Sequence, residues 1–182
     1  IFNNSSVYSI EPTDFAYNKL SKNVSLNKQI KNIKTFQYFI TAKNMKPKKV
    51  YSSWKLENSN QKHKKHYGTL KKTKFSKVIS LDKFLKEKKI SKKILIKCDV
   101  DGNELDVFKS GKKFIKKHKP YVIMELAPYL YPEFGYDVNE LLNLLKEYNY
   151  KFYDAKNYSE IKNIYNYAKN ISDGSSENIF LK

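Results

Sequence analysis

Short apolar runs alternate along the chain with stretches in which apolar residues recur three and four positions apart. Runs rich in β-branched and aromatic residues are typical of strands, and the second pattern is typical of helices. Strands are predicted at residues 7–10, 33–40, 50–56, 78–81, 94–98, 121–126, 150–153 and 178–181. Helices are predicted at residues 13–27, after Ser80, from Glu104, at 112–118 and at 138–148. This alternation predicts an α/β fold.

The same periodicity predicts which side chains face the core. The buried positions expected in the helices are Phe15, Leu20, Val24 and Leu26 in the first, Phe84 and Leu85 in the second, Leu105, Val107 and Phe108 in the third, and Val138, Leu141, Leu142, Leu144 and Leu145 in the last. Residues 33–40 form one expected strand, with Phe36, Tyr38 and Ile40 on one face. Residues 94–98 are almost wholly apolar, which predicts a strand buried on both faces of a parallel sheet. The strand at 178–181 is expected to close an antiparallel edge.

Two segments interrupt this pattern. Residues 43–75 are rich in lysine and have few apolar anchors, so a long excursion from the domain is expected there. Residues 154–177 form a variable C-terminal segment, in which residues 157–170 have the spacing of a helix with Ile161, Ile164 and Ala168 inward. With 182 residues, the chain is expected to be a single domain.

The chain is strongly basic, with a formal net charge of +18. This charge suits nucleic acid, anionic lipid or an acidic substrate. All of the basic residues are lysines, however, whereas nucleic-acid sites use the planar arginine fork for base contacts. A composition rich in Lys and Asn and without Arg is also what an AT-rich genome would encode. Nucleic-acid binding therefore stays the less favoured interpretation.

The length of the apolar runs and the single cysteine give two further expectations. No apolar run reaches the ~20 residues that a membrane-spanning helix needs, so no membrane span is expected. Cys98 is the only cysteine, and it lies in an apolar stretch. A lone cysteine of this kind is usually a small core residue, and a reducing cytoplasm is the default expectation.

Acidic residues follow three predicted strands. Ile10 leads into Glu11, Cys98 into Asp99 and Met124 into Glu125. In an open parallel sheet, ligands bind beyond the carboxyl ends of the strands. A carboxylate such as that of Glu11 accepts hydrogen bonds from both hydroxyls of a ribose diol, although capping of the next helix explains it equally well.

No metal centre is predicted. The segment from Asp99 to Glu104 resembles the start of a calcium loop, but Gly102 does not fall at the sixth position of a loop that begins with a carboxylate. A strand-to-helix turn in which Gly102 supplies an unusual backbone conformation is the better explanation. His63 and His66 lie three residues apart without further zinc ligands, so solvated histidines are expected.

Several segments together resemble the FkbM-type methyltransferases. They are residues 7–12 (VYSIEP), 80–84 (SLDKF), 96–104 (IKCDVDGNE), Gly111 and 119–125 (KPYVIME). Each segment alone is weak, but their order and spacing are fairly specific. The resemblance covers about residues 5–153.

This resemblance implies a Rossmann-like class I methyltransferase sheet, mostly parallel with an antiparallel edge strand. It also implies transfer of a methyl group from S-adenosylmethionine to a hydroxyl of a saccharide-like small molecule or glycan precursor. By position in the motifs, Glu11 would hold the cofactor ribose, and Thr41 and Ala42 would lie near the adenine. Asp99 would lie beside the methyl group as a catalytic base or orienting group. The resemblance places Asp101, Glu104 and Glu125 on the acceptor side, with Glu125 a second catalytic candidate.

The glycine-rich turn that normally follows the first strand of this family has no match here, because the first glycine is Gly68. The first βα unit of the fold is therefore expected to be missing, and the natural protein is expected to extend upstream. A chain without this cofactor loop would have lost activity if nothing replaced it. Two alternatives remain, a basic protein that binds or modifies RNA and a non-catalytic remnant of the fold.

Overall fold

The computed structural model describes residues 5–52, 62–65, 67–90 and 93–182. These residues form two compact units, one comprising Ile1–Ile79 and the other Ser80–Lys182.

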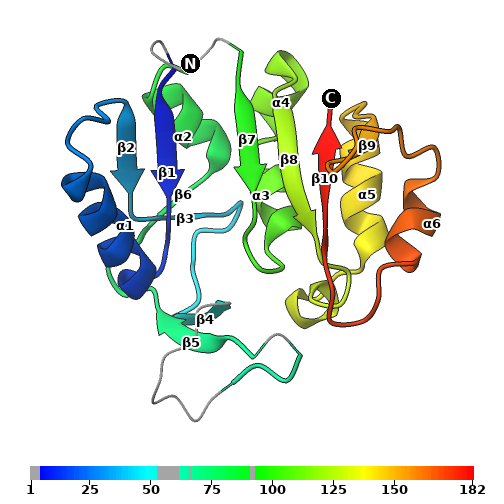
Figure 1. The fold of residues 1–182 in the computed structure, drawn as a ribbon, viewed down its shortest axis with the longest axis horizontal. Helices are drawn as coiled ribbons and strands as arrows, with labels where there is room; N and C mark the ends of the chain where they lie inside the picture. The colour runs from blue at the N-terminus through cyan, green and yellow to red at the C-terminus, as the bar shows by residue number, and fades with distance from the viewer. Residues whose placement is uncertain (1–4, 53–61, 66, 91–92) are drawn as a thin grey trace. The chain divides into compact units, whose positions relative to one another are not determined.

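The first unit begins with a βαβ arrangement (Figure 1). Strand β1 (Val7–Ile10) leads through helix α1 (Asp14–Leu26) into β2 (Ile33–Phe36), which pairs with β1 in parallel. The Thr13 hydroxyl accepts a hydrogen bond from the Ala16 amide at 3.4 Å and so caps α1. On the face of α1 that was predicted to be buried, Phe15, Leu20 and Val24 are half-buried. The prediction was wrong for Leu26, which is 69% exposed because it ends the helix.

The single strand predicted at residues 33–40 is wrong, because two strands are present. They are β2 and β3 (Tyr38–Ile40), and β3 pairs in parallel with β6 (Lys77–Ile79) rather than with β1. The chain changes partner at Gln37, whose carbonyl accepts from the Lys77 amide at 3.0 Å. The Gln37 side chain donates to Asp14 Oδ1 at 2.7 Å, which fixes the bend.

The lysine-rich excursion contains an antiparallel pair of strands. Strand β4 (Lys49–Ser52) pairs with β5 (Thr69–Lys72). The strand predicted at residues 50–56 thus starts one residue early, and its second half lies outside the described residues. His63 is only 6% exposed and packs edge-on against Tyr51, so the prediction of a solvated side chain was wrong for it. His66 lies outside the described residues.

The second unit is built on a mixed four-stranded sheet in the order β7-β8-β10-β9 (Figure 1). Its strands are β7 (Leu95–Cys98), β8 (Tyr121–Leu126), β9 (Phe152–Asp154) and β10 (Glu177–Leu181). β7 and β8 are parallel, and β10 is antiparallel to both β8 and β9. The antiparallel strand is therefore internal, and the prediction that it forms the edge was wrong.

The expectation of a mostly parallel sheet also needs correction. Among the described residues, three strand pairs are parallel and three are antiparallel, distributed over one four-stranded and three two-stranded sheets. The fold is α/β, with small mixed sheets.

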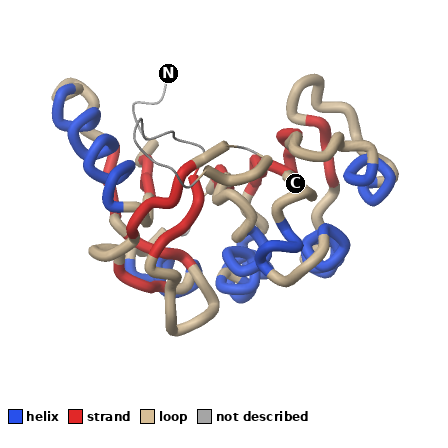
Figure 2. Tube along the Cα trace, turned by 90° about the horizontal axis from the view of Figure 1, so that it is seen from below, coloured by secondary structure: helices blue, strands red, loops and turns tan. Residues whose placement is uncertain are grey.

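Helices α3 (Glu104–Ser110), α4 (Lys112–His118) and α5 (Val138–Glu147) lie on one side of the four-stranded sheet (Figure 2), whereas α6 (Ile164–Lys169) lies beyond its β9 edge (Figure 1). The unit also contains α2 (Leu81–Glu87) and a 3₁₀ turn, η1 (Tyr131–Phe134), before α5. Along β8, the buried Val122, Met124 and Leu126 alternate with more exposed residues. Leu95 on β7 is 59% exposed, so the prediction of a strand buried on both faces was wrong.

Most predicted helices of this unit are confirmed. Ser80 and Asp137 cap α2 and α5 through their side chains. The helix considered for residues 157–170 is limited to α6, although Ile164 and Ala168 are buried in it as expected. In the described part of the chain, no helix is long and apolar enough to cross a membrane.

Candidate functional site

The turn between β7 and α3, together with the first residue of α3, carries three acidic residues, Asp99, Asp101 and Glu104. Asp101 and Gly102 both have positive φ angles, +49° and +99°. A Cβ atom at Gly102 would lie 2.4 Å from Phe134 Cε2, so glycine is required for space as well as for conformation. The predicted role of Gly102 in a strand-to-helix turn is confirmed.

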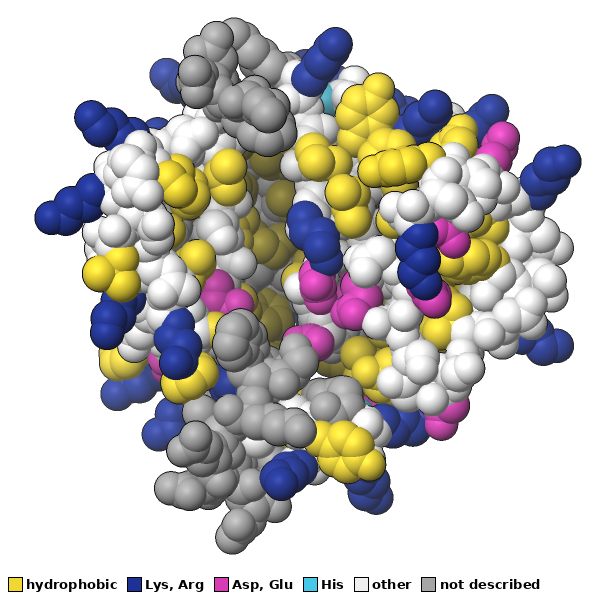
Figure 3. Space-filling view, viewed as in Figure 1, with side chains coloured by type: hydrophobic (Ala, Val, Ile, Leu, Met, Phe, Trp, Pro, Cys, Tyr) yellow, Lys and Arg dark blue, Asp and Glu magenta, His cyan; other side chains and the backbone are white. Residues whose placement is uncertain are grey.

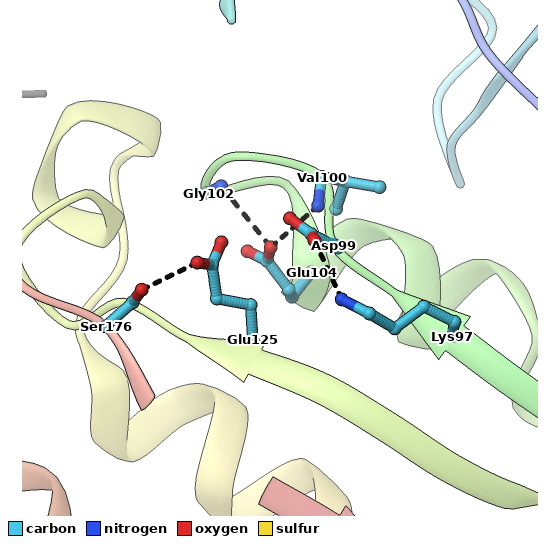
Figure 4. Close-up of polar contacts among 7 residues, drawn as sticks. All are labelled: Lys97, Asp99, Val100, Gly102, Glu104, Glu125 and Ser176. Atoms are coloured by element: carbon cyan, nitrogen blue, oxygen red, sulfur yellow. Dashed lines mark hydrogen bonds and ion pairs between the residues drawn. The ribbon is translucent and has the colours of Figure 1, made fainter. Parts of the chain in front are cut away.

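Glu104, the first residue of α3, reaches back into this turn (Figure 4). Its Oε1 atom accepts hydrogen bonds from the amides of Val100 at 3.2 Å and Gly102 at 3.4 Å. The side chain is 1% exposed, and Oε2 has no hydrogen-bond partner among the described residues. Burial raises the pKa of Glu104 to about 7, because water no longer solvates the charged form.

Asp99 follows the last residue of β7. Its Oδ2 atom lies 2.7 Å from Lys97 Nζ, and both side chains are about half exposed. Since Lys97 and Asp99 are two residues apart on an extended strand end, they lie on the same side of the chain. The ion pair leaves Asp99 accessible to solvent.

Glu125 lies within β8, opposite Asn178 of β10, and not just beyond the strand as the sequence suggested. Ser176 donates a hydrogen bond of 2.6 Å to its Oε1 atom (Figure 4). Burial raises the pKa of Glu125, and the negative charge of Asp99 raises it further, while the Ser176 hydrogen bond opposes these effects.

The structure brings three of these acids together. One carboxylate oxygen each from Asp99, Asp101 and Glu125 lie within 4.8 Å of one another. Figure 3 shows acidic side chains gathered over the carboxyl ends of β7 and β8, beside a lysine. The acids that the sequence placed in one turn and one strand therefore form a single cluster.

Two tyrosines support the turn from behind. The Tyr136 hydroxyl donates to the Gly102 carbonyl at 2.8 Å, and the ring of Tyr136 stacks on Tyr131 at 4.9 Å between centroids. The Tyr131 hydroxyl accepts from the Ala127 amide at 3.1 Å. Burial is the main cause of the raised pKa of both phenols, so both stay neutral and act as fixed dipoles around Glu104.

An open cavity of about 730 Å³ lies in the same unit. It is lined by Pro128 and Tyr129 after β8, Val138 and Asn139 at the start of α5, residues of the α6 region (Asn163, Tyr165, Asn166, Ala168, Lys169 and Ile171), and Ser172 and Asp173 before β10. Burial raises the pKa of Tyr129, and the negative charges of Glu125 and Asp101 raise it further. Tyr129 thus connects the cavity to the acidic cluster electrostatically.

The first unit contains the other predicted site residues. Glu11 follows β1, and its Oε1 atom accepts from the Thr13 amide at 2.7 Å and from the Thr13 hydroxyl at 2.6 Å. Its Oε2 atom accepts no hydrogen bond from the residues that the structure describes. Thr41 is 2% exposed, and its hydroxyl accepts from the Lys43 amide at 2.9 Å, whereas Ala42 is exposed.

Comparison with known families identifies the chain. Residues 2–152 match the family described as the methyltransferase FkbM domain. The chain belongs to this family. Comparison with curated proteins gave no match.

A solved structure supports the same fold. The crystal structure of methyltransferase FkbM from Methylobacillus flagellatus KT is similar with a TM-score of 0.51 and 14% sequence identity. The similarity covers 97% of this chain but only 36% of the bacterial protein, so the chain spans about a third of its relative. At this identity the likeness shows the fold alone, which is the α/β fold of an FkbM methyltransferase.

The family match of residues 2–152 includes the turn that carries Asp99, Asp101 and Glu104. Sequence reasoning missed Ser176, which lies 51 residues after Glu125. It also missed the hydrogen bond from Tyr136 to Gly102, because a tyrosine just before an expected helix is usually an ordinary core residue. Neither contact leaves a local signal in the sequence.

Proposed function

We propose that this FkbM chain takes part in transfer of a methyl group from S-adenosylmethionine to a hydroxyl of a saccharide-like acceptor. The observation that carries the proposal is the pair Asp99 and Glu125, whose carboxylates lie together at the ends of β7 and β8. A sugar hydroxyl is a weak nucleophile, so a base within hydrogen-bond reach is needed. Family membership supports the reaction class, and the acidic pair supplies the base.

Glu125 is the better base of the two. Its raised pKa makes it a stronger proton acceptor than an ordinary carboxylate, and Ser176 fixes its orientation. In the proposed reaction, the bond between methyl carbon and sulfur breaks as the bond to the acceptor oxygen forms, and the hydroxyl proton passes to Glu125. Asp99 accepts a hydrogen bond from the same hydroxyl or its neighbour and aligns it. The cofactor supplies the electrophilic methyl group on a positively charged sulfur.

The acceptor would occupy the cavity beside Tyr129. Its lining combines two tyrosine rings with the side-chain amides of Asn139, Asn163 and Asn166. Rings and amides suit a ligand that has apolar faces and many hydroxyls, as a saccharide has. Asp101 and Glu104 keep their proposed place on the acceptor side, Asp101 within the cluster and Glu104 behind it.

Residues of the first unit fit the cofactor in part. The Oε2 atom of Glu11 is available to accept a hydrogen bond from a ribose hydroxyl, and Thr13 holds the other oxygen in place. The Thr41 hydroxyl accepts a hydrogen bond from the Lys43 amide and still has its own proton to donate, so Thr41 and the exposed Ala42 keep their proposed place near the adenine. These residues would hold the nucleoside of the cofactor.

The remaining parts of the proposal concern organisation. We propose that both units belong to one Rossmann-like methyltransferase domain, which the family match supports by running across their boundary. The cytoplasm remains the proposed compartment, because Cys98 is a buried free thiol of the core.

Calorimetric titration of the chain with S-adenosylhomocysteine tests the proposal. Saturable binding is expected, and Glu11→Ala should weaken it by ~1–3 kcal/mol, or roughly 5- to 150-fold, as for a lost partner of a polar group. Glu147→Ala removes an exposed acid of α5 and should leave binding unchanged. Absence of binding, or equal loss in both variants, would overturn the cofactor proposal for this chain.

The acceptor is tested separately. Chain and labelled cofactor are incubated with simple methyl glycosides, and label transfer to the sugar is measured for the native chain and for Glu125→Gln. The native chain should transfer label to the sugar, and Glu125→Gln should reduce the rate of transfer at least ~100-fold, which is in the range for loss of a general base. Transfer only to RNA would instead favour the alternative suggested by the charge of +18, and RNA binding would then weaken steeply with salt.

A further inference from the structure

The acidic cluster has the geometry of a metal site. We propose that Asp99, Asp101 and Glu125 bind a divalent cation such as Ca²⁺, Mn²⁺ or Mg²⁺. Their three oxygen atoms come from side chains on two strand ends and lie within 4.8 Å of one another. Such cations prefer carboxylate oxygens, and the cluster contains no histidine or thiol ligand that would favour zinc.

The distances agree with a shared ion. Two ligands of one cation are at most twice the metal–oxygen distance apart, which is about 4.6–5.2 Å for Ca²⁺ and about 4.0–4.2 Å for Mg²⁺. The observed limit of 4.8 Å lies within the range for Ca²⁺. A smaller ion requires the three carboxylates to draw together by a few tenths of an ångström. Asp99 is half exposed, so it has the freedom to do so.

A second observation points to the same ligand. The buried Glu104 carboxyl has one oxygen held by two amides of the turn, and its Oε2 atom has no partner among the described residues. Figure 4 shows the Glu104 carboxylate between those of Asp99 and Glu125, with its second oxygen toward Glu125. A buried polar atom without a partner costs ~1–3 kcal/mol. A cation in the cluster, or water bound to it, would remove this cost.

The charge around the cluster also favours a cation. Lys97 is the cation that contacts Asp99 in this structure, and an exposed ion pair of this kind is worth less than about 1 kcal/mol. A divalent ion would therefore displace the Lys97 ammonium at little cost. It would also remove the repulsion between Asp99 and Glu125.

The sequence alone did not indicate this site. The segment from Asp99 to Glu104 lacks the spacing of a contiguous calcium loop, and His63 and His66 belong to a different part of the chain. Glu125 lies more than twenty residues after Asp99 and Asp101 in the chain, and only the parallel pairing of β7 with β8 brings it beside the turn. The proposal goes beyond the methyl-transfer function, because binding of the ion requires neither cofactor nor acceptor.

Titration with Mn²⁺, followed by electron paramagnetic resonance of the free ion, tests the site directly. The chain should bind one Mn²⁺ with a dissociation constant below about 1 mM, the weak limit of protein calcium sites. Ca²⁺ should compete for it. Asp99→Asn and Glu125→Gln should each weaken binding at least ~10-fold, since each removes a charged ligand without changing shape.

Glu147→Gln is the matched control, because Glu147 is an exposed acid of the same unit that pairs with Lys112 and Lys116. It should leave Mn²⁺ binding unchanged, and circular dichroism confirms that each variant is folded. Absence of saturable binding, or binding that Asp99→Asn and Glu125→Gln leave unchanged, would overturn the site. Since no cofactor is present, this result would not bear on the methyl-transfer proposal.

Discussion

Replacing Glu104 with glutamine should remove a large part of the pH dependence of stability. In the native chain, the buried carboxyl has a pKa raised from 4.5 to about 7. The folded state therefore holds a proton that the unfolded state has released between these values. A group with a raised acidic pKa stabilises the fold at low pH, and this stabilisation is lost as the pH rises toward 7.

The two pKa values set the magnitude. One pKa unit corresponds to about 1.4 kcal/mol, and integration of the proton release between pH 5 and pH 8 gives a loss of roughly 2.5 kcal/mol from Glu104. Glutamine has the same shape, and its side-chain oxygen can still accept from the Val100 and Gly102 amides. The variant should match the native chain near pH 5 and exceed its stability by roughly 2.5 kcal/mol at pH 8.

Urea unfolding, measured by circular dichroism at pH 5, 6, 7 and 8 with a chelator present, provides the comparison. The difference between native chain and variant cancels the contributions of groups that do not interact with Glu104. Tyr131 and Tyr136 stay neutral over this pH range, because burial raises the pKa of both phenols. Glu147→Gln serves as control, because its two lysine partners lower the pKa of Glu147 and it titrates below this pH range. Its difference from the native chain should not vary with pH.

A constant difference between native chain and Glu104→Gln from pH 5 to pH 8 would refute the reasoning. It would mean that Glu104 is ionised in the fold at all of these pH values, and that burial does not dominate its electrostatics. A difference that grows with pH but favours the native chain would also refute it, since the sign follows from burial alone.

Two further predictions concern the same turn. Gly102→Ala should destabilise the fold by ~2–4 kcal/mol, because the new Cβ atom would meet Phe134 and the φ angle is strained for alanine. Gly174→Ala should cost only ~1 kcal/mol, because no atom lies within 4 Å of its Cβ position. Thermal unfolding of both variants measures the difference. Ser176→Ala removes the hydrogen bond that lowers the pKa of Glu125, so the acidic limb of the pH–rate profile for methyl transfer should move to higher pH, and a shift to lower pH would contradict the base role of Glu125.

Local signals in the sequence predicted the helix starts and the key turn. Thr13, Ser80 and Asp137 cap helices, because each side-chain oxygen accepts from an amide only two or three residues ahead. Gly102 could be placed in a turn for a similar reason, since a positive φ angle is a property of one residue. Such features depend on neighbours in the chain, so the sequence contains them directly.

Features set by distant partners were not predictable in the same way. The break at Gln37 depends on the pairing of β3 with β6, about forty residues later. Glu125 meets Ser176 only because β10 returns beside β8. The sequence supplied the acidic residues of the site, but their assembly required tertiary structure. The family motif identified the turn, and the pairing of strands determined which side chains meet there.

The internal position of β10 also affects how this unit is made. β10 follows β9 in the chain but lies between β9 and β8. During synthesis, β8 and β9 leave the ribosome with no strand between them, and each presents unpaired backbone groups until residues 177–181 emerge. Exposed strand edges of this kind recruit other chains. A nascent chain that stalls within the last helix would therefore be an aggregation hazard, although nearly all of its core residues had already been made.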